Sequence, residues 1–149
     1  MHVTITADDA GRLTVRPAAD ATTPGSPDSV TVLLCPPDAY DRRSGTLVHP
    51  YRYTPAPTGV AAAPVYPPRD ATVVDLNAPT VLVAIHPLSR RLLAVGPFTG
   101  PDRAQQWWHA DSNQFATSGT ACHVLPLPGN DNADHLDTVI ALSQEGDLR

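Results

Sequence analysis

Cys122 and His123 are the residues whose types best suit covalent chemistry in this sequence. A thiolate becomes an effective nucleophile when a nearby imidazole takes its proton. The two residues lie in a run, 121–127, that is typical of a β-strand, and neighbouring side chains of a strand point to opposite faces. We therefore expect that this thiol and this imidazole do not meet, and the sequence predicts no catalytic residue.

Residues that could hold a metal are scattered. The six histidines show no HxH or HxxxH spacing and the two cysteines no CxxC spacing, so the sequence offers no ligand pair. Cys35 precedes two prolines and is interpreted as a small buried hydrophobe, with both cysteines kept as free thiols. Serine-hydrolase, dinucleotide and phosphate-loop motifs are absent, and the lack of lysine excludes Schiff-base chemistry. The expectation is a protein without enzymatic activity, metal or cofactor.

Aromatic residues give the more promising pattern. Trp107 and Trp108 are adjacent in a predicted helix, and adjacent helical positions differ by about 100° in direction. Both can be buried only if two surfaces cover the helix. One surface is the predicted sheet, and the other is either the chain's own proline-rich segment or a partner protein. Because aromatic residues are enriched at interaction hot spots, we assign five candidate interaction residues: Trp107, Trp108, Tyr51, Tyr53 and Tyr66.

Composition restricts the class of protein. The 149 residues fit one domain, 1–149. All ten basic residues are arginine, fourteen of the fifteen acidic residues are aspartate, and there are 17 prolines, a bias typical of a GC-rich genome. A net charge of −5 argues against binding to nucleic acid, and the arginine pairs at 42–43 and 90–91 are interpreted as solvated turns.

Targeting signals are absent from the sequence. No window reaches the roughly 18 consecutive apolar residues of a membrane span, and the first residues lack the charged and apolar regions of a signal peptide. We expect a soluble, cytoplasmic protein that does not bind membranes.

Hydrophobic patterning predicts the elements that position these residues. Strands are expected at 2–6, 12–16, 29–35, 71–74, 80–85, 91–95 and 121–127. The unbroken apolar run 80–85 indicates a strand buried on both faces. Gly96-Pro97 is expected to end the strand at 91–95. Asp8 and Asp9 lie in the first hairpin turn, where acidic side chains cap backbone amides.

The remaining segments differ in character. Residues 36–70 form a proline-rich excursion, with a short strand at 51–53. A helix is predicted to begin at Thr99, which has capping-box spacing to Asp102, and to end near 111–113; a second spans 131–143. The prediction is an α+β fold with a mixed or antiparallel sheet of five to six strands and two helices.

One stretch resembles a known family. The run LLAVGPFT at 92–99, followed by DRAQQW at 102–107, resembles the strand–GPF–helix half-repeat of SPOR-like domains. The resemblance covers 92–127 and implies a ferredoxin-like sheet with helices on one face in the C-terminal half. Known members bind peptidoglycan glycan strands through the sheet.

These observations favour a non-catalytic protein-interaction module, an accessory or regulatory factor of a GC-rich bacterium or its phage, whose partner is another protein or a second copy. A virion or other self-assembling structural component is one alternative. A binder of small ligands or glycans on a SPOR-like sheet is the other, and it would show an open sheet face lined by aromatic residues.

Overall fold

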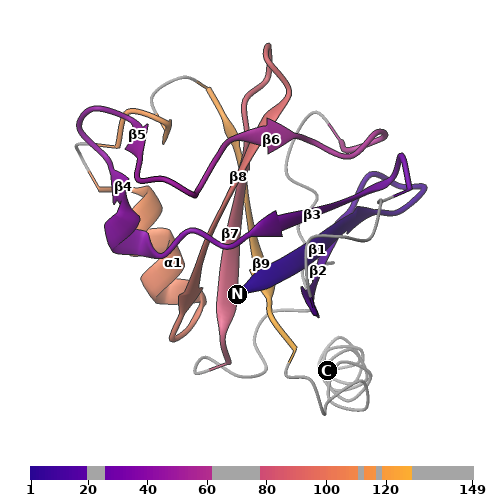
Figure 1. Ribbon diagram of the computed structural model, residues 1–149, viewed down its shortest axis with the longest axis horizontal. Helices are drawn as coiled ribbons and strands as arrows, with labels where there is room; N and C mark the ends of the chain where they lie inside the picture. The colour runs from indigo at the N-terminus through magenta and orange to yellow at the C-terminus, as the bar shows by residue number, and fades with distance from the viewer. Residues whose placement is uncertain (20–25, 62–77, 111–112, 117–118, 129–149) are drawn as a thin grey trace, which may run out of the picture.

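The N-terminal part of the chain forms a three-stranded antiparallel sheet. A computed structural model describes residues 1–19, 26–61, 78–110, 113–116 and 119–128. The sheet has the order β2-β1-β3 and consists of β1 (His2–Ala7), β2 (Leu13–Ala18) and β3 (Ser29–Leu33) (Figure 1). Its hairpin turn is fixed by Asp8, whose Oδ1 accepts hydrogen bonds from the backbone N–H groups of Ala10 and Arg12 at 2.9 Å. The expected hairpin and its acidic cap are confirmed.

The C-terminal part forms a second, four-stranded antiparallel sheet with the order β6-β8-β7-β9. Its strands are β6 (Thr54–Pro55), β7 (Thr80–Ile85), β8 (Arg91–Phe98) and β9 (Ala121–Pro126). Helix α1 (Pro101–Trp108) connects β8 to β9, which run parallel to each other because β7 lies antiparallel between them. The helix predicted after the strand at 91–95 and the strand predicted at 121–127 are both present.

A 3₁₀ helix and a small hairpin lie between the two sheets in sequence. They are η1 (Pro37–Ala39), β4 (Tyr40–Asp41) and β5 (Thr46–Leu47), and they lie next to α1 in Figure 1. The chain enters this segment along β8, where the N–H of Cys35 donates to the carbonyl oxygen of Ala94 at 3.0 Å and the N–H of Gly96 donates to that of Cys35 at 2.9 Å. Both β6 and Cys35 therefore extend the same edge of β8.

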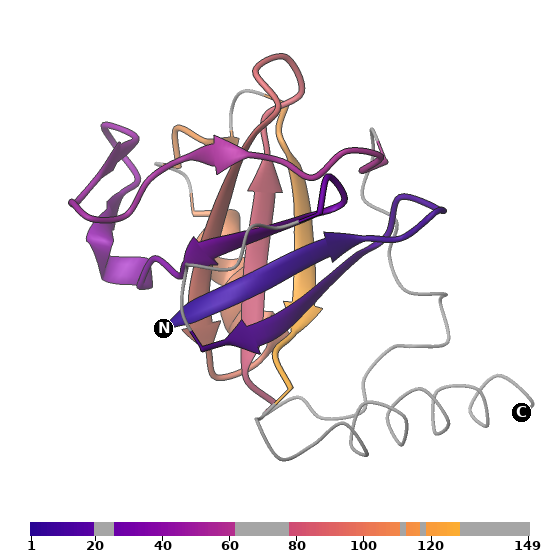
Figure 2. The same ribbon diagram turned by 45° about the vertical axis from the view of Figure 1, so that its right-hand side comes forward.

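The four-stranded sheet is covered on both faces. The three-stranded sheet crosses one face at a large angle (Figure 2), and α1 with the η1–β5 segment covers the other. All six residues of β7 are buried, as the run 80–85 predicted. Val81, Val83 and Ile85 pack towards the three-stranded sheet, whereas Leu82 and Ala84 pack towards α1. The core consequently has two parts, one on each face of β7.

The expected single sheet of five to six strands is wrong, because the described strands form sheets of three, two and four. In β1 and β2 only alternate residues are buried. A strand with one apolar face buries it by packing face to face on another sheet, which joining that sheet at its edge would not achieve. The coarser α+β assignment, with mostly antiparallel strands, holds.

Two local predictions are also corrected. Tyr51–Tyr53 is not a strand; the pairing occurs one residue later, at Thr54 and Pro55. Gly96-Pro97 does not end β8, because a bulge at Gly96 (φ 150°) lets the strand continue to Phe98. A Cβ at Gly96 would lie 3.0 Å from the carbonyl oxygen of Thr80, which explains why the bulge requires glycine.

The helix termini also differ from the prediction. The residue that caps α1 is Gly100, without a side-chain hydrogen bond, so the Thr99–Asp102 capping box does not form. The helix ends earlier than expected, at Trp108, whose carbonyl oxygen accepts a hydrogen bond from Asn113 Nδ2 at 3.2 Å. The predicted strand 71–74 and helix 131–143 lie outside the described residues.

Candidate interaction site

Seven aromatic side chains gather on the α1 face of the four-stranded sheet. This aromatic cluster consists of Tyr40, Tyr51, Tyr53, Phe98, Trp107, Trp108 and Phe115. Tyr53 stacks on Phe115 with ring centroids 5.4 Å apart and planes 4° apart. Phe115 also meets Trp108 and Tyr40 edge to face, at 6.3 and 6.4 Å. Such pairs are favourable because the edge of one ring is positive and the face of the next is negative.

The two tryptophans have different environments, as their angular separation on α1 requires. Trp108 is 7% exposed and packs towards the sheet. Trp107 is half-buried and lies against Tyr40, with ring centroids 5.4 Å apart, and against Phe98, at 6.0 Å. Its indole N–H donates to the carbonyl oxygen of Pro37 at 3.3 Å. The second surface that covers α1 is therefore, in part, the chain's own η1–β4 segment.

The predicted tyrosines join the same region in part. Tyr51 and Tyr53 are both half-buried at the border of the aromatic cluster. The hydroxyl of Tyr53 donates to the carbonyl oxygen of Gly45 at 2.9 Å, which ties this tyrosine to the β4–β5 hairpin. Tyr66 lies outside the described residues. The structure thus brings four of the five predicted interaction residues together.

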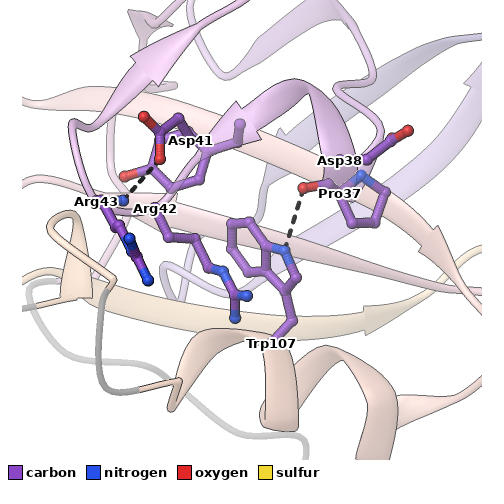
Figure 3. A pocket seen from close by; sticks show the side chains of 7 residues that line it. Pro37, Asp38, Asp41, Arg42, Arg43 and Trp107 are labelled. Atoms are coloured by element: carbon purple, nitrogen blue, oxygen red, sulfur yellow. Dashed lines mark hydrogen bonds between the residues drawn. The ribbon is translucent and has the colours of Figure 1, made fainter.

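A hollow opens to solvent beside Trp107, with a volume of about 460 Å³. Its lining comes from η1, the β4–β5 hairpin and α1: Pro37, Asp38, Tyr40, Asp41, Arg42, Arg43 and Trp107. In Figure 3 the side chains of Arg42 and Arg43 extend towards the side where Trp107 lies, Asp41 lies next to Arg43, and Asp38 lies apart from both arginines, beside Pro37. The hollow therefore has an aromatic wall with two guanidinium groups beside it.

The charged side chains that line the hollow differ in how many hydrogen bonds they form. Asp41 Oδ2 accepts a hydrogen bond from Ser44 Oγ at 2.6 Å, and its Oδ1 accepts one from the backbone N–H of Arg43 at 3.0 Å. These hydrogen bonds, that from Ser44 above all, lower the pKa of Asp41. Among the described residues the one ion pair joins Arg12 to Asp8, so neither Arg42 nor Arg43 forms an ion pair there. The positive charge of Arg43 nevertheless also lowers the pKa of Asp41, so Arg43 is attracted to this carboxylate without a direct contact.

The floor of the hollow is a buried aromatic ring. Tyr40 is 3% exposed, and burial raises the pKa of its phenol. Burial also raises the pKa of Tyr53. Both phenols are therefore neutral at ordinary pH, and the ring of Tyr40 lies against that of Trp107.

The cysteines and His123 do not assemble into a site. Cys35 extends the edge of β8 whereas Cys122 lies on β9, so two strands separate them. Three inter-strand spacings place their Cα atoms about 14 Å apart, twice the reach of a disulfide. Burial raises the pKa of Cys35 to about 11 and that of Cys122 to about 12. The prediction of free thiols is confirmed.

His123 lies on the face of β9 opposite Cys122. It is 3% exposed, on the same face as Leu125, which packs between the two sheets. Burial lowers its pKa, and its Nε2 has no hydrogen-bond partner among the residues that the structure describes. Cys122 packs instead towards α1. The expectation that this thiol and this imidazole do not meet is borne out by the packing.

Within the described ranges no three histidine, cysteine or acidic side chains converge as a metal site would require. The same part of the chain has no helix with the length and apolarity that crossing a membrane demands.

Sequence reasoning missed the residues that shape the hollow. Pro37, Tyr40 and Arg42 fall in the segment interpreted as an irregular excursion, and Arg42-Arg43 was interpreted as a solvated turn. The available signal was the alternation of tyrosines and arginines between 40 and 53, a composition common at interaction surfaces.

Comparison with known proteins adds no family to this description, since no family model, curated protein or solved structure matches the chain.

Proposed function

We propose that this chain is a protein-interaction module, acting as an accessory or regulatory factor, and that the hollow beside Trp107 is its contact surface. The observation that carries the proposal is a half-buried indole next to two arginines without carboxylate partners among the described residues. Tryptophan, tyrosine and arginine are the residue types that contribute most to binding at protein interfaces.

Trp107 serves this role better than Trp108. A hot-spot side chain must be accessible before binding and buried after it. Trp108 is already buried by its own chain and stabilises the fold, whereas Trp107 retains exposed surface and lines the hollow. Its N–H is satisfied by Pro37, so the ring can be covered by a partner without leaving a polar group unpaired.

The test is affinity purification of the tagged chain from its native cells, beside Trp107→Ala and Leu88→Ala variants. Leu88 is the matched control because it is 89% exposed and lies in the β7–β8 turn, away from the hollow. We expect a stoichiometric protein that Leu88→Ala retains and Trp107→Ala loses, while both variants keep a cooperative thermal transition. If both variants retain the partner equally, the hollow is not the surface that contacts it.

If Trp107→Ala unfolds the chain, Trp107→Phe takes its place. This substitution keeps an aromatic ring against Tyr40 and Phe98 but removes the hydrogen bond to Pro37 and much of the exposed indole. A folded Trp107→Phe variant that binds the partner as well as the parent would contradict the proposal.

Self-assembly remains the alternative function, and it uses the same experiment with a different readout. Light scattering over a hundredfold range of protein concentration distinguishes the two. A mass that rises with concentration, and stops rising in Trp107→Ala, supports a self-assembling component.

The glycan-binding alternative needs an open aromatic sheet face. Both faces of β7 and β8 are covered within the described part of the chain, so the structure adds no support to this alternative.

A further inference from the structure

We propose that the hollow recognises an extended acidic segment of a partner protein, with two of the segment's carboxylates paired to Arg42 and Arg43 and an apolar side chain between them packed on Trp107. This inference rests on the proposed function and specifies the chemistry of the partner. It is carried by the charge and the shape of the hollow.

Charge complementarity selects an anionic partner. Arg42 and Arg43 are adjacent in sequence, line the same hollow, and have no ion pair among the described residues. Asp41, the closest carboxylate in sequence, is already committed to Ser44 and to the backbone N–H of Arg43. A guanidinium group presents several N–H donors in a plane that matches a carboxylate in a bidentate arrangement. Two such groups on one hollow therefore fit two carboxylates.

The lining also favours carboxylates over phosphate. The lining also contains Asp38 and Asp41, so its four charged side chains sum to zero. A phosphate carries up to two negative charges at one point and would be repelled by both aspartates. Two separated carboxylates instead place one charge near each arginine, with no doubly charged group at a single point.

The neutral part of the lining specifies what lies between the carboxylates. Trp107 is half-buried, and Pro37 and Tyr40 supply the remaining apolar surface. A proline or aliphatic side chain of the partner can cover this surface at little entropic cost, because the tyrosine and the indole are held in place by each other and by Pro37. The volume of about 460 Å³ fits a few residues of an extended chain and not a folded element.

The test selects peptides from a random twelve-residue display library on the immobilised full chain and measures the affinity of the winners by fluorescence anisotropy. The decisive variant is Arg42→Gln/Arg43→Gln. Arg90→Gln/Arg91→Gln is the matched control, because it removes two charges from an adjacent pair where the β7–β8 turn meets β8, and neither residue lines the hollow. Any general effect of net charge appears equally in both.

We expect the selected peptides to be rich in aspartate and glutamate. Arg42→Gln/Arg43→Gln should weaken them about tenfold or more, the size expected for losing charge-assisted hydrogen bonds, and Arg90→Gln/Arg91→Gln should leave them within about twofold. Affinity should also fall as salt rises from 50 to 300 mM, because exposed ion pairs are screened. Replacing the acidic residues of a peptide by their amides should abolish binding.

The outcomes separate the two proposals. Peptides that are neutral or basic, or that tolerate Arg42→Gln/Arg43→Gln but not Trp107→Ala, would overturn the acidic partner and leave the interaction module standing. A phosphorylated peptide that binds more tightly than its glutamate counterpart would overturn the assignment to carboxylates. No selection above background, together with no partner in the purification, would overturn the proposed function itself.

Discussion

The two faces of the four-stranded sheet are built from different chemistry. Between the sheets lies a layer of aliphatic residues donated by regular strands, among them Val3, Ile5, Val83 and Leu92, each fully buried. On the α1 face lies the aromatic cluster, whose members come mostly from loops, from the helix and from the ends of strands. The first layer is closed to solvent on all its members, whereas the second continues through Trp107 into the hollow.

The two faces differ in the residue types that fill them and in how much surface those residues leave exposed. β-branched and aliphatic residues fill a layer densely and offer nothing to a partner once buried. Aromatic residues pack as strongly but carry polar tips that fix them to distant backbone, as Tyr53 does to Gly45 and Trp107 to Pro37. One face can therefore present a rigid surface to solvent, while the other only holds the sheets together.

The largest expected effect separates the two tryptophans. Trp108→Ala should lower the free energy of unfolding by about 3–5 kcal/mol, the range for truncating a buried tryptophan. Trp107→Ala should cost clearly less, because its ring is only half-buried. Urea unfolding followed by circular dichroism measures both. Equal losses would mean that Trp107 belongs to the stability of the fold as fully as Trp108.

Two glycines with positive φ, one in each region, allow the backbone packing of the two regions to be compared. Gly11 (φ 79°) lies against the 59–61 segment, where an added Cβ would sit 2.6 Å from the N of Ala61, whose N–H donates to the carbonyl oxygen of Gly11. Gly45 (φ 69°), in the β4–β5 hairpin, has no atom nearer than 3.8 Å to that position. Substitution by alanine costs each about 1–2 kcal/mol for the left-handed conformation.

Gly11→Ala should therefore destabilise the protein more than Gly45→Ala, since it also breaks a backbone contact. The same urea titration compares them, with the parent chain as reference. If Gly45→Ala proves the more damaging, the hairpin beside the aromatic cluster is packed more tightly than the contacts of Gly45 indicate, and the division between the two regions weakens.

The smallest effect concerns buried polar groups. Asn113, near the aromatic cluster, is satisfied by the carbonyl oxygen of Trp108 and the N–H of Phe115. Within the described part of the chain, His123 Nε2 has no hydrogen-bond partner, nor has the buried hydroxyl of Tyr40. Burial lowers the pKa of His123 in the folded state below its unfolded value of about 6.5. Below that value the unfolded chain binds more protons than the folded one, so acid favours unfolding.

Stability should therefore decrease as pH falls from 6.5 towards the folded pKa of His123, by up to about 1.4 kcal/mol per pH unit. Urea midpoints at pH 7.5, 6.5 and 5.5 measure the slope. His123→Leu should flatten it, and His109→Gln, which changes an exposed histidine at the end of α1, should leave it intact. A slope that persists in His123→Leu would assign the acid sensitivity to another group.

Much of the strand content follows from the sequence. Alternation in 2–6 and 12–16, and the continuous apolar run 80–85, predict β1, β2 and β7, because burial on one face or on two leaves a distinct periodicity. The separation of Cys122 from His123 follows from the same rule. These features depend only on neighbours along the chain.

Tertiary structure decided what depends on residues far apart. The partition of strands into two sheets requires knowing which apolar faces meet, and the bulge at Gly96 that carries β8 on to Phe98 depends on its fit against Thr80. The hollow arises because the indole N–H of Trp107 reaches Pro37, 70 residues away in sequence, and places Arg42 and Arg43 beside the ring. The sequence around Trp107 fits a helix, and the sequence around Pro37 fits a helical turn, whether or not the two residues touch. Local patterning therefore cannot predict their contact.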